Sequence, residues 1–61
     1  MKFRVDVIEQ DGARHPGAVR HDTLDAALAA VLEMNNAVDS HGDPVWVGVT
    51  IEISPVMSRT N

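Results

Sequence analysis

The chain has 61 residues, no cysteine and a formal net charge of −4. This length holds one domain, which buries only about 60% of the surface of the unfolded chain. The missing cysteines exclude a disulfide framework, and five lysines and arginines are too few for a duplex-binding surface, which excludes nucleic acid as the main partner. No segment has the apolar length of a signal peptide or membrane span, so we expect a cytoplasmic protein without a membrane partner.

The first element that the sequence predicts is a strand over residues 2–9. Phe3, Val5 and Val7 alternate with charged residues, which is the period of two of a half-buried strand. Ile8 departs from this pattern and is expected on the face that carries the charges. The apolar face is therefore expected to point into the core.

Two turn signals compete in the connection to the next element, Asp11-Gly12 and Pro16-Gly17. A two-residue hairpin at Asp11-Gly12 pairs Ile8 with His15 and places Val19 on the face that points away from the core. A longer loop over residues 10–17 instead places Val19 on the core face of a short strand. Because Val19 is the one large apolar residue of this segment, we favour the longer loop.

Residues 23–40 have the pattern of an amphipathic helix, with Asp22 or Thr23 as the N-cap and Gly42 just beyond the C-terminus. At 100° per residue, one stripe of the helix is expected to face the sheet. This stripe consists of Leu24, Leu28, Val31 and Val38.

Residues 45–54 predict the last strand, because every odd position from 45 to 53 is β-branched and apolar. Alternation places Trp46 on the opposite, uncovered face of the sheet. Pro55 is expected to end the strand because it lacks an N–H donor. Residues 1–55 then form one domain, and residues 56–61 form a tail that is an alternative cover for Trp46.

Together these elements predict an α+β fold of β-β-α-β order. The sheet is expected to have three mostly antiparallel strands with the first strand in the centre, and the single helix to pack on one face. The other face remains uncovered.

The three histidines suggest a metal site, in which His41 or Asp43 would join His15 and His21. Six residues of extended chain span about 20 Å, too far for two ligands of one ion. Ser40, His41 and Asp43 lack a nucleophile elbow, and the glycines form no phosphate loop. We therefore expect no catalytic residue, no metal and no cofactor.

The segment "DPVWVGVTIEISP" resembles the second strand of the small tautomerases related to 4-oxalocrotonate tautomerase. That family uses an amino-terminal proline as general base, whereas Lys2 follows Met1 here. The resemblance covers about a fifth of the chain, and no site residue is carried over. It implies, as one alternative, a proton-transfer enzyme that would use His15 or His21 as the base.

The function expected from the sequence is a small non-enzymatic interaction module that self-associates, as a dimer, or docks on a protein partner. Its contacts are expected on the uncovered sheet face and on the loop over residues 11–21, the one basic patch of the chain. The interface residues are Trp46, Ile8, Arg4, Thr50, Arg14, His15, Arg20 and His21. A second alternative is a small inhibitor of the kind encoded by phages and mobile elements, which occludes a larger host assembly.

Overall fold

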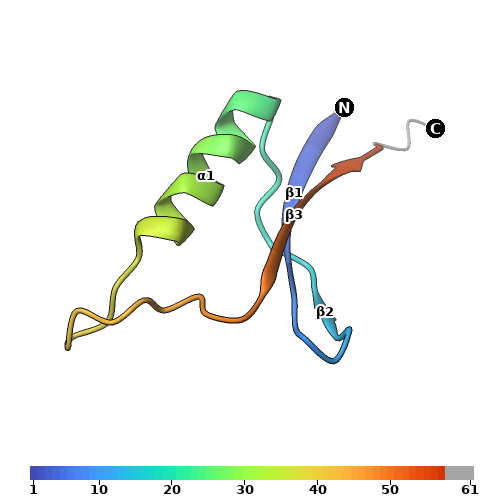
Figure 1. The fold of residues 1–61 in the computed structure, drawn as a ribbon. Coiled ribbons are helices and arrows are strands. Elements are labelled where there is room, and N and C mark those ends of the chain that lie inside the picture. Colours follow the sequence, from blue (N-terminus) through green and yellow to red (C-terminus); the bar gives the residue numbers. More distant parts are fainter. Residues whose placement is uncertain (58–61) are drawn as a thin grey trace.

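A computed structural model describes residues 1–57 as three strands and one helix in the order β-β-α-β (Figure 1). The elements are β1 (Lys2–Ile8), β2 (Arg14–His15), α1 (Leu24–Asn36) and β3 (Thr50–Val56). β1 lies in the centre of the sheet, and both β2 and β3 pair with it antiparallel. The predicted fold class, element order and central first strand are confirmed.

The β1–β2 hairpin turns at Asp11-Gly12 through a three-residue loop. The N–H of Gly12 donates to the carbonyl of Glu9 (2.9 Å), and the N–H of Glu9 donates to the carbonyl of Ala13 (2.8 Å). Gly12 has φ 93°, the left-handed conformation that such a loop requires at its third position. The favoured loop over residues 10–17 is therefore wrong, and the two-residue alternative is right about the place of the turn.

This turn sets a register that neither alternative contained, with Ile8 opposite Arg14 and Val7 opposite His15. The extra loop residue shifts the pairing by one position from that of a two-residue hairpin. Val19 lies on the helix side of the sheet but does not pair beside Val7, and it stays 61% exposed. The sequence prediction thus gave the burial of Val19 more weight than the turn signal at Asp11-Gly12, and the structure follows the turn signal.

Beyond β2 the chain returns to β1 after a bulge. Phe3 and His21 form a second bridge, in which each N–H donates to the other residue's carbonyl at 2.8 Å. Between the two paired regions, residues 4–6 of β1 face the longer segment 16–20. Gly17 lies against β1 here, because a Cβ at this position would be 2.3 Å from the carbonyl oxygen of Val5.

Helix α1 begins at the predicted cap and ends earlier than expected. The Thr23 hydroxyl accepts a hydrogen bond from the N–H of Ala26 (3.1 Å), as an N-cap does. Ala37 is already extended, and the following turn is closed by the Asp39 carboxylate, which accepts from the N–H groups of His41 and Asp43. The expected end near residue 40 is therefore wrong, because a side-chain acceptor favours the turn over continued helix.

The face of α1 that meets the sheet is rotated from the predicted one. The helix packs mainly on β1 and exposes the leucines, with Leu24 48%, Leu28 50% and Leu32 61% exposed. Its buried or half-buried positions are Ala27, Ala30, Val31 and Met34, and the C-cap residue Ala37 is half-buried as well. The alanines allow the helix backbone to approach the strands closely, and Ala27 is completely buried.

The expected strand over residues 45–54 begins only at Thr50. Gly48 has φ 70°, which breaks the extended backbone before the strand. Trp46 therefore does not follow the strand alternation and lies on the helix side of the sheet, contrary to the prediction. Pro55 does not end β3, which is an edge strand and tolerates it opposite Phe3.

The core of the described residues is small. Val5 and Ala27 are its buried apolar residues, and Asp6 is completely buried on the opposite face of the sheet. Of the expected tail, Val56 belongs to β3, whereas residues 58–61 lie outside the described residues. Within residues 1–57, no helix has the length and apolar character needed to cross a bilayer.

Candidate functional site

The carboxylate of Asp6 is the most heavily bonded group on the open face of the sheet, the face opposite α1. Arg4 donates to both of its oxygens, from Nε at 2.6 Å and Nη2 at 2.9 Å. Arg14 donates from Nη1 at 2.7 Å, and the N–H of Gly17 and the hydroxyl of Ser54 donate at 3.3 Å. Asp6 thereby connects the central strand, the bulge and both edge strands.

Arg14 extends these contacts to Glu52, whose carboxylate it binds at 3.2–3.3 Å. We call Arg4, Asp6, Arg14, Glu52 and Ser54 the ion cluster. The arginines hold the pKa of Asp6 well below its usual range, with Arg4 the largest cause, although burial opposes the shift. A carboxylate this strongly bonded is a poor general base, and we infer a structural role for the cluster.

The ion cluster makes the stability of the fold dependent on pH. Because the pKa of Asp6 is lower folded than unfolded, its contribution is fully present above the unfolded value of about 3.9 and is lost as the pH falls toward the folded value. We expect the urea midpoint, measured by circular dichroism, to fall steadily below about pH 4. The Asp6→Asn variant should show a shallower dependence, and an identical slope in both proteins would assign the effect to other carboxylates.

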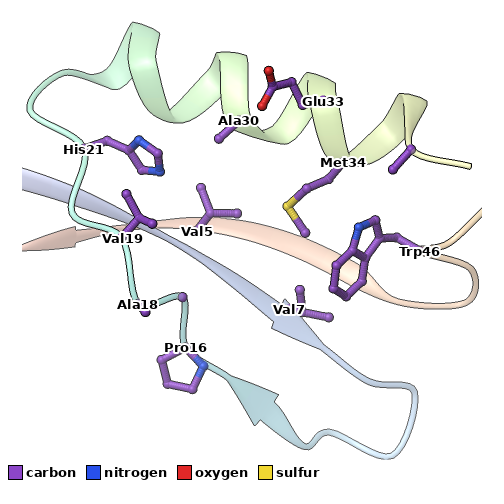
Figure 2. A pocket seen from close by; sticks show the side chains of 12 residues that line it. Val5, Val7, Pro16, Ala18, Val19, His21, Ala30, Glu33, Met34 and Trp46 are labelled. Atoms are coloured by element: carbon purple, nitrogen blue, oxygen red, sulfur yellow. The ribbon is translucent and has the colours of Figure 1, made fainter.

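On the helix side, a cleft of about 620 Å³ opens between α1 and the segment that follows β2 (Figure 2). Its floor is the apolar face of β1. The residues that line it are Val5, Val7, Pro16, Gly17, Ala18, Val19, His21, Ala30, Glu33, Met34, Ala37 and Trp46. Nearly all of these are apolar, so the cleft is an unfilled part of the interface between helix and sheet.

Trp46 occupies one end of the cleft and is 43% exposed. Figure 2 shows the side chains of Met34 and Val7 pointing toward its indole ring. His21 and Glu33 are the titratable side chains along the cleft wall. The arrangement suits an apolar group, because apolar contacts far outnumber hydrogen-bonding groups.

The structure divides the predicted interface residues between the two faces of the sheet. Arg4 and Arg14 lie on the open face within the ion cluster, and Ile8 pairs with Thr50 on the same face. Trp46 and His21 instead line the cleft.

Of the two remaining predicted residues, His15 is the last residue of β2 and Arg20 lies in the segment between β2 and α1. His15 is exposed and bonds the Glu9 carboxylate at 2.8 Å, and Arg20 donates to the carbonyl of Gly17 at 2.9 Å. The eight residues therefore do not form one continuous surface.

The histidines considered as metal ligands are not brought together. His15 pairs with Val7 and His21 with Phe3, four residues apart along β1, or about 13 Å. In residues 1–57, no three histidine, aspartate or glutamate side chains cluster in a way that would hold a metal ion. Comparison with protein-family models, curated proteins and solved structures finds no match for this chain.

Sequence reasoning did not identify Asp6 or the cleft. Asp6 could have been found from the sequence, because Arg4 and Asp6 are two positions apart and therefore lie on the same face of a strand. A cation next to an anion on one face indicates an ion pair. No sequence pattern indicated the cleft, because its walls depend on which face of α1 packs inward. The alanines and Met34 that line it were expected on the back or at the edge of the helix.

Proposed function

We propose that this chain is a small non-enzymatic protein-interaction module that docks on a protein partner through the cleft on the helix side of the sheet. One observation carries the proposal: an apolar cleft of about 620 Å³ with a half-exposed tryptophan at one end. Tryptophan is enriched among the residues that dominate binding energy, and pockets of this size and polarity accept apolar groups. The expected occupant is an apolar side chain of the partner.

The distribution of polar groups supports the helix side over the open face. Arg4 and Arg14 on the open face already bind Asp6 and Glu52, so a partner would have to compete with these internal ion pairs. The cleft makes no such demand, because an apolar side chain entering it displaces only water. The non-enzymatic character is proposed because Asp6 is bonded on all sides and the histidines are separated.

Peptide display tests the proposal directly, because it selects binding sequences from a random library. Peptides selected on the immobilised wild-type chain should carry a large apolar anchor residue, and their binding should change the fluorescence of Trp46, the one tryptophan of the chain. We expect Trp46→Ala to weaken their binding about 30-fold, the effect of losing about 2 kcal/mol. Isothermal titration would measure both affinities.

Val47→Ala is the matched control, because Val47 is adjacent in sequence, 68% exposed and outside the cleft lining. It should leave the affinity within about twofold, as expected for a residue that makes no contact with the bound peptide. Enrichment of no sequence, or equal affinity for the wild type and Trp46→Ala, would rule out docking in the cleft.

A further inference from the structure

We propose that the partner segment bound in the cleft is basic: it carries a lysine or arginine near its apolar anchor, and this cation pairs with the carboxylate of Glu33 at the rim of the cleft. The proposal rests on docking in the cleft and names the chemistry of the occupant. Two observations support it. One is a carboxylate in the cleft lining that no cation of residues 1–57 binds, and the other is the acidic character of the helix wall.

Glu33 is the acidic residue of the cleft lining, and it lies at the rim. It shares one flank of α1 with Ala30 and Ala37, which precede and follow it by three and four residues. Because these alanines are short, the carboxylate extends beyond them, and Figure 2 shows it pointing away from the strands. A peptide that fills the apolar floor would therefore meet this carboxylate as it leaves the cleft.

No cation of residues 1–57 pairs with Glu33. Its neighbours on α1 at three- and four-residue spacing are alanines and Asn36, so the helix offers no base for an ion pair. The cations of β1 and β2 bind other carboxylates, and Arg20 donates to a backbone carbonyl outside the lining. His21, the other titratable residue of the lining, lies at the end of the cleft away from Trp46 (Figure 2). The Glu33 carboxylate can therefore bind a cation of a partner.

The helix wall belongs to an acidic part of the chain. Residues 22–57 contain no lysine or arginine, and their acidic residues are Asp22, Asp25, Glu33, Asp39, Asp43 and Glu52. Asp22 and Glu52 are paired with cations of β1 and β2. The others lie on α1 and in the turn before Trp46, which lead to the wall and to one end of the cleft. Negative charge on this side steers a basic partner toward the cleft and repels the phosphates of nucleic acids and lipids.

The positions of the two contacts limit where the cation lies in the partner. Glu33 directly precedes Met34, whose side chain points toward the indole of Trp46 in Figure 2. Consecutive Cα atoms are about 3.8 Å apart, and an extended chain advances about 3.3–3.6 Å per residue. A lysine or arginine within about three positions of the anchor therefore reaches Glu33 while the anchor contacts Trp46.

The probes are peptides selected from a random library on the wild-type chain. They should carry a lysine or arginine within about three positions of the apolar anchor. Replacing this residue by glutamine should weaken binding about fivefold, which corresponds to about 1 kcal/mol, the upper end for an exposed ion pair. Glu33→Gln should cause the same loss with the original peptide and no further loss with the glutamine peptide. Isothermal titration would measure the four affinities, and the change in the peptide requires no variant of the chain.

Asp25→Asn is the matched control, because Asp25 is also exposed on α1 and lies outside the cleft lining. It should leave the affinity within about twofold, since it removes the same charge without removing the contact. Equal losses for Asp25→Asn and Glu33→Gln would overturn the ion pair. Selected peptides that depend on Trp46 but show no enriched cation would overturn the basic partner and leave docking in the cleft intact. Enrichment of no sequence at all would overturn both.

Discussion

Asp6→Asn is expected to lower the free energy of unfolding by about 2–3 kcal/mol. The change keeps the shape of the side chain and removes its charge, so Arg4 and Arg14 lose their shared anion at the centre of the sheet. Breaking a wholly buried ion pair costs about 3–5 kcal/mol, and the lower value applies here because Arg14 is 42% exposed. A chain of this length has a total stability of only about 3–9 kcal/mol, so the variant should lose a large part of its stability.

Urea unfolding followed by circular dichroism at one fixed protein concentration measures this effect. Asp43→Asn removes the same charge from an exposed residue whose carboxylate binds no other described residue, and should change the stability by less than about 0.5 kcal/mol. Equal midpoints for the two variants would show that the ion cluster contributes little, and that the apolar contacts alone hold the sheet together.

Gly17→Ala is expected to lower the free energy of unfolding by about 3 kcal/mol, the upper end of the range for overpacking. The new methyl group would lie 2.3 Å from the carbonyl oxygen of Val5, inside any allowed contact distance. That oxygen belongs to the central strand, so the bulge would have to move instead. The movement would also weaken the hydrogen bond from the Gly17 N–H to Asp6.

Gly12→Ala is the matched comparison, because the hairpin turn has open space around this residue and a left-handed backbone with φ 93°. Its cost should be about 1 kcal/mol, from backbone strain alone. The two variants should therefore differ by about 2 kcal/mol in urea unfolding under the same conditions. A smaller loss for Gly17→Ala than for Gly12→Ala would show that the bulge adapts to a side chain and does not depend on close contact with β1.

Local features of the chain were predictable because the physics that produces them is local. The alternation over residues 2–9 identified the central strand, and Thr23 before an alanine-rich segment identified the helix start. Asp11-Gly12 supplied the turn residues that a short hairpin requires, although the longer loop was favoured over this turn. In each case the determining residues lie within a few positions of one another.

The types of residue in parts of the candidate site were predictable from the sequence, but their positions in the fold were not. Trp46 was predicted as an interface residue on the uncovered face of the sheet, but this position followed from an expected strand that Gly48 interrupts. The basic residues Arg4 and Arg14 were identified as contacts, whereas the structure uses them to neutralise Asp6. A charge pattern in a sequence does not show whether its partner lies within the chain or outside it.

The sequence by itself determined the α+β class, the order of the elements, the central position of β1 and the start of α1. The tertiary structure alone decided the helix face that packs inward, the bulge after β2 and the side on which Trp46 lies. These depend on contacts between distant residues, such as Gly17 against Val5 and Arg14 against Glu52. Such contacts form only when the strands are paired, and no pattern within one segment encodes them.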